Sequence, residues 1–338
     1  MSLARVIVPA ACFALILVGG VLWMRAPQGP LGPGQSAPKA LSSAATPVVS
    51  GQPSRMIPSP TAMPVDVYFL SEGSAAASGK RTPTMRQPTV NGTRRIANAK
   101  PVTDAGAGPF VAPRFSPDGL ELLFSKPGYN GLYTMGADGG AVTQVSGREG
   151  IGFRAKWTPE GTVETRGNDG ENQVLKSDGT PMDAAAYESD ASIVGAYTKD
   201  DAVYLRRAPG EAPVVVTPPD GADRYYGGVL SPDGKSIAYN GLHTGLYVQS
   251  LAGGPAVHLG EGYSPQWLPD GSGVVYNISV DDGHNLLGSD LFLSSPDGTT
   301  VSNLTGGAAG IPLNPSISPD GSRLAYETEG RLFVADLR

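Results

Sequence analysis

An all-β fold of repeated antiparallel sheets is predicted by three features of the sequence. The pentapeptide Phe-Ser-Pro-Asp-Gly at 115–119 has close copies at 230–234, 267–271 and 317–321, and weaker copies at 157–161 and 197–201. The copies are spaced by 33 to 50 residues, which is typical of propeller and solenoid repeats. The 46 glycines and 31 prolines among 338 residues suit many short strands joined by tight turns. Together these features predict a six-bladed β-propeller of four-stranded antiparallel blades.

Residues 1–25 are predicted to form an N-terminal signal anchor, a single transmembrane helix. Residues 6–24 are nineteen residues without a charge, and at about 1.5 Å rise per residue such a helix just crosses a hydrocarbon core. The run exceeds the roughly 7–15 residues usual for the apolar part of a signal peptide, and no small-residue cleavage site follows it. We therefore expect the remainder of the chain on the periplasmic side of the inner membrane. The alternative is a cleaved signal peptide and a periplasmic or secreted protein.

A linker and a lead-in segment separate this anchor from the repeats. Residues 26–64 contain nine prolines and only two charged residues, a composition that predicts a disordered, partly extended tether. Residues 65–112 form the lead-in, which holds six basic and no acidic residues between Lys80 and Lys100. We interpret these cations as a solvated arm, or as one folded against the acidic domain. Attraction to anionic lipid headgroups is the alternative.

The repeat unit, which occupies residues 113–338, is predicted to be a four-stranded meander. In the clearest copy Phe115 ends one strand and Ser-Pro-Asp-Gly makes the turn, because proline presets φ, aspartate bonds to the local backbone and glycine accepts a positive φ. Further strands are expected at 120–125, 131–135 and 141–145. The copies near 153 and 191 are degenerate, and the 33-residue spacing of the second leaves it one strand short.

Two features relate the copies to each other. An aromatic residue stands eight positions after the start of the turn in four copies, at Phe124, Tyr239, Tyr276 and Tyr326. This constancy predicts one packing position between neighbouring sheets. The last copy supplies only three strands, so a strand at 93–98 is predicted to complete its sheet, close the ring and remove the free edge.

The repeats resemble those of the TolB-like six-bladed β-propellers, whose units run apolar-Ser-Pro-Asp-Gly, then apolar-aromatic, then an aromatic-containing strand ending in Asp-Gly. Four copies match this pattern strongly and two weakly, over about residues 113–338. The resemblance implies six blades. True TolB proteins place a sizeable α/β domain before the propeller and work with a peptidoglycan-associated lipoprotein. The lead-in is too short for such a domain, so the resemblance covers the propeller part and implies a general role in the cell envelope.

Charge and cysteine content narrow the class of protein further. Residues 1–110 contain ten Lys/Arg and three Asp/Glu, whereas residues 111–338 contain fifteen and twenty-eight. An acidic globular part argues against nucleic acid as a partner, because nucleic-acid binders neutralise phosphates with Lys and Arg. Cys12 is the only cysteine, so no intramolecular disulfide can form.

No residues stand out as a catalytic set, and we expect neither an enzymatic activity nor a cofactor. The three histidines, His243, His258 and His284, are too few for the metal-dependent lyases that have similar propellers. His243 is expected in a loop between strands, and His258 at an exposed or edge position of a fourth strand. The sequence contains no Gly-x-Ser-x-Gly elbow and no Gly-x-x-x-x-Gly-Lys-[Ser/Thr] loop.

An insertion at 277–290 is the richest stretch in chemical terms. Its weak metal-ligand candidates, which could hold Ca²⁺ or a transition metal, are Asp281, Asp282, His284 and Asp290. Their spacing does not match the Asp-x-Asp-x-Asp-Gly calcium loop, and Asp-Asp-Gly is ordinary turn chemistry. A structural turn is therefore the favoured interpretation, with a partner-contact loop and a metal site as alternatives.

These observations predict an exported, membrane-tethered, non-enzymatic binding or scaffold module of the bacterial cell envelope. It would present a propeller face to a protein or glycan partner. A propeller enzyme acting on a carbohydrate or lactone is the first alternative, and a structural spacer the second. A channel lined by small and apolar residues would favour the binding module, whereas carboxylates around a metal on the channel axis would favour the enzyme.

Overall fold

A computed structural model describes residues 88–167, 172–182, 195–208, 210–218, 223–282, 285–306, 308 and 310–338. The predicted anchor at 1–25, the linker at 26–64 and the first part of the lead-in lie outside the described residues. Within the described part of the chain, no helix has the length and hydropathy needed to cross a membrane.

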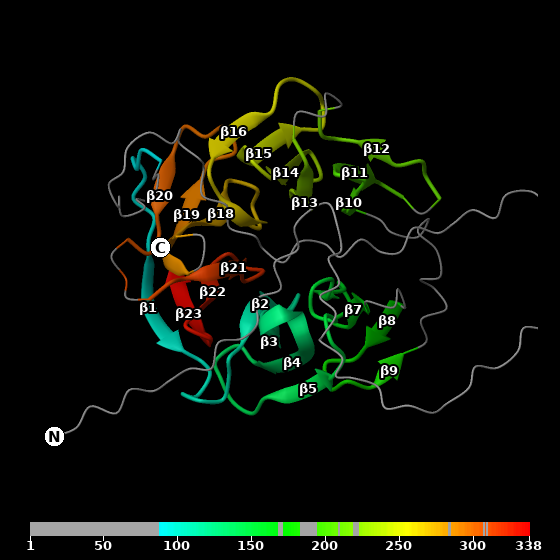
Figure 1. The fold of residues 1–338 in the computed structure, drawn as a ribbon, viewed down its shortest axis with the longest axis vertical. Coiled ribbons are helices and arrows are strands. Elements are labelled where there is room, and N and C mark those ends of the chain that lie inside the picture. The colour runs from blue at the N-terminus through cyan, green and yellow to red at the C-terminus, as the bar shows by residue number, and fades with distance from the viewer. Residues whose placement is uncertain are drawn as a thin grey trace, which may run out of the picture. The chain divides into compact units, whose positions relative to one another are not determined.

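The described strands form six separate antiparallel sheets, which we number blades 1 to 6 in chain order (Figure 1). Blade 1 contains β2 (Val111–Phe115), β3 (Glu121–Lys126), β4 (Asn130–Gly136) and β5 (Thr143–Ser146), with one 3-10 turn, η1 (Pro127–Tyr129), between β3 and β4. Blade 2 contains β6 (Lys156–Trp157), β7 (Val163–Arg166), β8 (Asn172–Leu175) and β9 (Pro181–Met182). Blade 3 contains β10 (Gly195–Lys199), β11 (Ala202–Arg206) and β12 (Val214–Val215).

The remaining three blades have four strands each. Blade 4 contains β13 (Tyr225–Leu230), β14 (Ser236–Gly241), β15 (Gly245–Ser250) and β16 (Val257–Gly260). Blade 5 contains β17 (Tyr263–Trp267), β18 (Val274–Asp281), β19 (Leu286–Ser294) and β20 (Val301–Asn303). Blade 6 contains β21 (Leu313–Ile317), β22 (Arg323–Thr328), β23 (Arg331–Leu337) and β1 (Ile96–Pro101).

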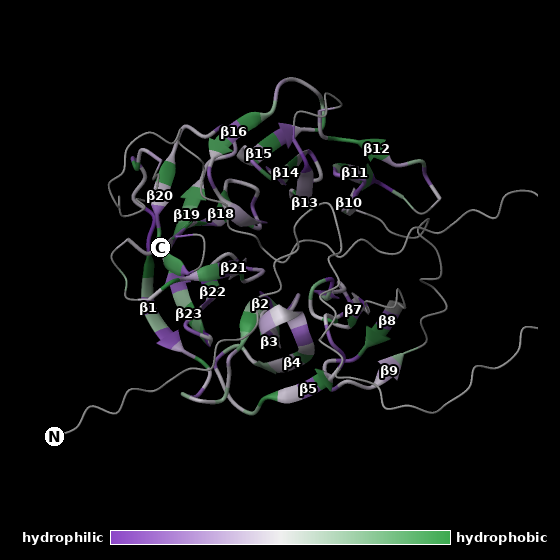
Figure 2. Cartoon of the chain, viewed as in Figure 1, coloured by the Kyte–Doolittle hydropathy of each residue, from purple (hydrophilic) through white to green (hydrophobic). Residues whose placement is uncertain are grey.

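The first strands of neighbouring blades lie side by side around a common centre. Contacts join β10 to β13, β13 to β17, β17 to β21 and β21 to β2, and a shared apolar core joins blade 1 to blade 2. The predicted all-β, six-bladed propeller is therefore confirmed. The prediction of four strands per blade is wrong for blade 3, where three strands are described, as the 33-residue spacing indicated. Its outermost strand β12 exposes Val214 and Val215 by 63% and 46%, and is apolar in Figure 2.

A strand from before the repeats completes blade 6. Strand β1 pairs antiparallel with β23, with Ile96 opposite Leu337 and Pro101 opposite Phe333. The segment just before β1 also bonds to blade 5, because Asn91 N and Gly92 N both donate to the carbonyl of Val301, at 3.0 and 2.8 Å. The predicted donor strand at 93–98 is thus in the expected place, but it begins and ends three residues later than predicted.

Antiparallel order sends alternate connections to opposite ends of the blades. We call one end the turn face, because it carries the Ser-Pro-Asp-Gly turns at 116–119, 231–234 and 318–321. We call the other end the loop face. It carries the connections between second and third strands and those between blades, such as 127–129, 147–155, 242–244, 282–285 and 329–330. Neighbouring blades repeat the same strand order, so each face is shared by the whole set.

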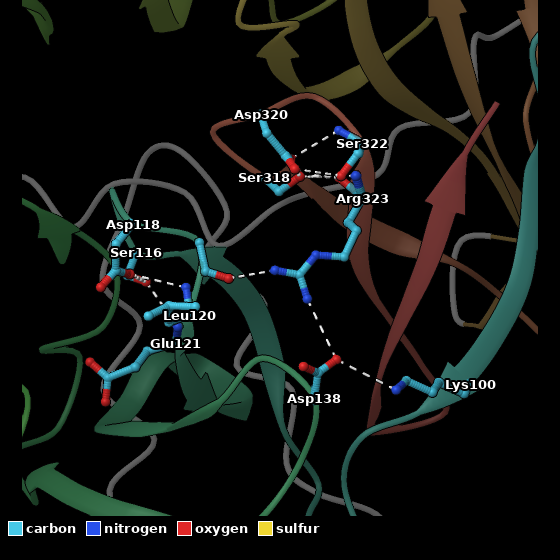
Figure 3. A network of polar contacts seen from close by, with 11 residues as sticks. Lys100, Ser116, Asp118, Leu120, Glu121, Asp138, Ser318, Asp320, Ser322 and Arg323 are labelled. Carbon is cyan, nitrogen blue, oxygen red and sulfur yellow. Dashed lines mark hydrogen bonds and ion pairs between the residues drawn. The ribbon is translucent and has the colours of Figure 1, made fainter.

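The pentapeptide that repeats through the sequence is confirmed as turn chemistry. In each intact copy the serine hydroxyl donates to the aspartate carboxylate: Ser116 to Asp118 at 2.6 Å, Ser231 to Asp233 at 2.7 Å and Ser318 to Asp320 at 2.5 Å. Figure 3 shows the first and last of these turns, in which the carboxylate also accepts a backbone N–H two residues further on. The Ser318 and Ser322 hydrogen bonds lower the pKa of Asp320 from 3.8 to about 2.

We expect Ser318→Ala to reduce the acid sensitivity of this turn. The folded pKa of Asp320 lies below its ordinary value of 3.8, so its contribution to stability is present above that pH and lost as the pH falls toward about 2. Without the serine hydroxyl, the folded pKa should move back toward 3.8. An NMR titration of the Asp320 carboxyl would measure this shift. Asp270, whose turn begins with Leu268 in place of serine, is the internal control and should not move.

The aromatic position predicted between neighbouring sheets is also confirmed. Each of these residues stacks on its cross-strand partner in the third strand: Phe124 on Tyr133, Tyr239 on Tyr247, Tyr276 on Phe292 and Tyr326 on Phe333, with ring centroids 5.6 to 6.0 Å apart. Each also belongs to the apolar core that its blade shares with the preceding blade. This repeated pair fixes the distance between sheets.

Tyr276→Phe is expected to stabilise the protein. The hydroxyls of Tyr276 and Tyr239 are buried without a hydrogen-bond partner, and burial raises the pKa of Tyr276 to about 12. An unsatisfied buried hydroxyl costs about 1–3 kcal/mol, and blade 1 has Phe124 at the same position. We expect a gain on the order of 1 kcal/mol, or about 2–4 °C in melting temperature. Tyr326→Phe is the matched control with a smaller gain, and a lower melting temperature for Tyr276→Phe would contradict the argument.

Candidate functional site

The first strands of four blades share a bulge near the loop face. Their ladders lose register between Val111 and Arg114, between Tyr226 and Val229, between Tyr263 and Gln266 and between Leu313 and Ser316. The bulged residues have a left-handed backbone, with φ of 55° at Ala112, 67° at Gly227, 53° at Ser264 and 49° at Asn314. Bulges turn side chains aside and concentrate at functional sites. The inner rim of the loop face is therefore lined, in these four blades, by small residues.

One buried carboxylate connects three of these bulges. The hydroxyl of Ser264 donates to Asn314 Oδ1 at 2.8 Å, and Asn314 Nδ2 donates to Glu327 Oε1 at 3.2 Å. The backbone N–H of Ala112 donates to Glu327 Oε2, and Glu327 is 6% exposed. Blades 5, 6 and 1 are thereby joined at the rim through a single side chain. The sequence did not single out Glu327, because its partners lie 13 and 215 residues away.

A second polar cluster holds the loops of blade 4. The carboxylate of Asp223, whose side chain is 1% exposed, accepts hydrogen bonds from three backbone N–H groups and two side chains of the same loops. The donors are Arg224 N at 2.8 Å, His243 N at 3.0 Å, His243 Nδ1 at 2.9 Å, Thr244 N at 3.0 Å and Thr244 Oγ1 at 2.6 Å. Burial acts to raise the pKa of Asp223, but the hydrogen bonds from Thr244 and His243 outweigh it and keep the pKa below 3.8.

The two described histidines lie where the sequence placed them, and in contact with the same loop. His243 is in the connection between β14 and β15, with its side chain 67% exposed. His258 is exposed on the outermost strand β16, and its Nε2 lies 2.6 Å from the carbonyl of Thr244. The carboxylate that orients His243 was missed from the sequence. Asp223 precedes its strand without any motif, and only the fold brings it to His243.

The insertion at 277–290 is an extended β-hairpin on the loop face. Strands β18 and β19 continue in register as far as the pair Asp281–Leu286. Asp290 lies opposite Ile278, three residues or about 10 Å along the strand from Asp281. Its carboxylate accepts hydrogen bonds from Thr305 at 2.8 Å and Asn303 at 3.1 Å. The favoured turn interpretation fits Asp282, which bonds to Asn285 across the hairpin.

The structure does not gather the predicted metal candidates into one group. His284 lies outside the described residues, and Asp290 is engaged within its own sheet. In the described portion of the chain, no group of three or more His, Cys, Asp or Glu side chains is placed to hold a metal ion. The metal interpretation of the insertion therefore stays a prediction.

Comparisons with known proteins agree with the resemblance seen in the repeats. A Protein TolB homolog of Chlorobium luteolum is 30% identical over 118 residues, which are 32% of this chain and 26% of the relative. The match thus spans about a quarter of that relative's length. No family model matches the chain.

Solved structures show likeness at the level of the fold. A chain of the mitotic checkpoint complex has a TM-score of 0.50 and 13% identity over 80% of this chain and 99% of its own length, which supports the fold alone. A structure described as a candidate TolB of Agrobacterium tumefaciens is 20% identical over 64% of this chain and 69% of its own, with a TM-score of 0.32.

Proposed function

We propose that this protein is an exported, membrane-tethered, non-enzymatic binding module that presents its loop face to a protein or glycan partner of the bacterial cell envelope. One observation carries the proposal: the departures from the repeat gather on the loop face. The Glu327 chain, the Asp223 cluster and the extended hairpin all belong to that face.

The turn face supports the proposal by contrast. Its turns repeat the same serine–aspartate hydrogen bond from blade to blade, so they present nearly the same chemistry around the ring. A repeated surface suits assembly of the fold. A surface that differs from blade to blade can distinguish one partner from another, because specificity depends on particular groups in particular places.

The composition of the inner rim favours binding over metal-dependent catalysis. Ala112, Gly227, Ser264 and Asn314 are small, and Glu327 is engaged in hydrogen bonds that hold the bulges. The uncharged run at 6–24 and the proline-rich stretch at 26–64 would supply the anchor and its tether. The periplasmic location and the partner class are part of the proposal. The TolB homolog of Chlorobium luteolum supports the propeller portion of it.

Site-specific photo-crosslinking of the full-length chain in its own envelope tests the proposal. Two leucines form a matched pair for a photo-reactive benzoylphenylalanine: Leu287 of the hairpin on the loop face, 46% exposed, and Leu120 on the turn face, 68% exposed. We expect a discrete cross-linked product from Leu287 that is absent from Leu120, and mass spectrometry would identify the partner. Equal products from both positions, or a product from Leu120 alone, would contradict a loop-face binding site.

A second candidate function rests on His243. Its Nδ1 lies 2.9 Å from the buried Asp223 carboxylate and its side chain is 67% exposed, an arrangement that can orient a general base. Hydrolysis of a carbohydrate or lactone is the corresponding activity. Turnover of a lactone panel that is lost in His243→Gln would support the enzyme, and absence of turnover in the wild-type protein would remove it.

A further inference from the structure

Arg114 of β2 is a half-buried cation without a counter-ion. Burial lowers the pKa of its guanidinium, and the one neighbour that raises it is Tyr129, whose phenol is neutral at pH 7. Within the described residues, no carboxylate or carbonyl accepts a hydrogen bond from the Arg114 side chain. A buried charge that lacks a partner costs stability, so this position calls for an explanation.

The register of blade 1 shows which way the side chain of Arg114 lies. Arg114 pairs with Leu123, whereas the next residue, Phe115, pairs with Leu122. Leu122 and Phe115 belong to the core shared with blade 6, and Leu123 belongs to the core shared with blade 2. Since alternate residues of a strand point to opposite faces, Arg114 lies on the side that meets blade 2. There the indole N–H of Trp157 donates to its backbone carbonyl at 3.1 Å.

The corresponding position in two other blades is occupied without a charge. In blade 6 it is Ser316, whose hydroxyl accepts the backbone N–H of Phe115 from blade 1 at 3.0 Å. In blade 4 it is Val229, whose carbonyl accepts the indole N–H of Trp267 at 2.9 Å. The packing between blades therefore does not require a guanidinium here. The charge of Arg114 has a purpose other than joining the two sheets.

The surroundings of Arg114 suit an anionic ligand. Tyr129 offers a hydroxyl, and its ring meets Phe153 edge to face with centroids 5.2 Å apart. Arg154 is exposed three residues before Trp157, as Ala112 stands three before Phe115. The small residues of the other bulges are thus replaced by a second cation. A guanidinium binds the two oxygens of a carboxylate or phosphate in a fork, and does so most strongly where water is scarce.

We propose that the inner rim between blades 1 and 2 binds a carboxylate or phosphate group, with Arg114 as the fork and the Tyr129 hydroxyl as a further donor. This inference rests on the proposed function, because it names the chemical group of the partner that the loop face would hold. Blades 5, 6 and 1 present the Ser264–Asn314–Glu327 chain at the same rim, so the basic sector gives the partner a defined orientation.

Thermal unfolding of the full-length protein in different anions tests the site. We expect sodium phosphate or sodium acetate, but not sodium chloride at the same ionic strength, to raise the melting temperature in a saturable way, on the order of 3 °C at ten times Kd. Arg114→Met should lose this rise. Lys235→Met is the matched control and should keep it, since it removes one cation from the turn face, where the Lys235 side chain is 82% exposed. A response to phosphate alone indicates a phosphorylated partner, and a response to acetate indicates a carboxylate.

A second measurement separates binding from a structural role. Without added anion, Arg114→Met should melt at the wild-type temperature or above it, because the change removes an uncompensated buried charge. A lower melting temperature with the anion response retained would overturn the proposal, as would a wild-type protein that responds equally to all three salts. A Leu287 cross-link without an anion response would reject this site alone. An anion response without any cross-link would instead reject the partner-binding function.

Discussion

Deletion of residues 90–100 is expected to destabilise the whole set of blades and not only the last of them. This segment carries most of β1, which forms the outer strand of blade 6 against β23, and the residues that bond to Val301 in blade 5. It therefore spans two blades. Its removal would expose the edge of β23 and uncover Leu337, which is 7% exposed in the intact protein.

The expected loss is large because many hydrogen bonds disappear together. Besides the pairs between β1 and β23, the deletion removes the bonds from Arg95 N to the Arg338 carbonyl and from Ile96 N to the Leu304 carbonyl. At roughly 0.5–1.5 kcal/mol net for each hydrogen bond, the sum exceeds about 5 kcal/mol, a large fraction of the stability of a typical domain. Calorimetry should show a melting temperature lower by more than about 10 °C.

Polar contacts between blades 6 and 1 explain why the effect should spread. Arg323 in β22 donates to the Gly119 carbonyl of the first turn at 2.6 Å and lies 3.5 Å from Asp138 (Figure 3). Its guanidinium also lies over the ring of Phe115, 5.2 Å from the centroid. Disorder in blade 6 would therefore remove support from blade 1.

Two further variants make the deletion experiment decisive. A synthetic peptide of residues 88–101 added to the truncated protein should restore part of the melting temperature, because it can pair with β23 again. Ile96→Ala removes only packing against the core between blades 5 and 6, so a loss of about 1–2 kcal/mol is expected from it. An unchanged melting temperature for the deletion would contradict the role of β1.

The sequence predicts the parts of the fold that depend on local chemistry. The Ser-Pro-Asp-Gly turns encode their own hydrogen bonds within five residues, so their role at Ser116 and Ser318 could be predicted. The aromatic position represented by Tyr239 and Tyr276 could also be predicted, because a constant spacing from the turn fixes its place in the second strand. The boundaries of β1 were less accurate, since its register depends on a partner strand more than 230 residues away.

The candidate site could not be predicted, because long-range register creates it. Glu327 becomes a link between blades only when Ala112 and Asn314 adopt left-handed bulges, and no motif announces these. Arg114 looks like an ordinary strand residue in the sequence. Its burial and its lack of a counter-ion follow from the alternation that places it against blade 2.

Asp223→Ala is expected to release the loops of blade 4 and to cost about 3 kcal/mol of unfolding free energy. The substitution removes the shared acceptor of five donors, among them the N–H groups of His243 and Thr244. Asp233→Ala is the matched control. It also removes one aspartate from a turn of blade 4, but the Asp233 side chain is 52% exposed, so a loss below about 1 kcal/mol is expected.

The dependence of this loss on pH identifies its cause. The folded pKa of Asp223 lies below 3.8, so its contribution to stability is present above that pH and is lost as the pH falls through the folded pKa. Urea unfolding should therefore show a large difference between wild type and Asp223→Ala at pH 7 and a smaller one near pH 3. If the two proteins differed equally at both pH values, packing of the side chain and not its charge would hold the loops. The Asp223 carboxylate would then lose its role in orienting His243, and the hydrolytic candidate would lose its structural basis.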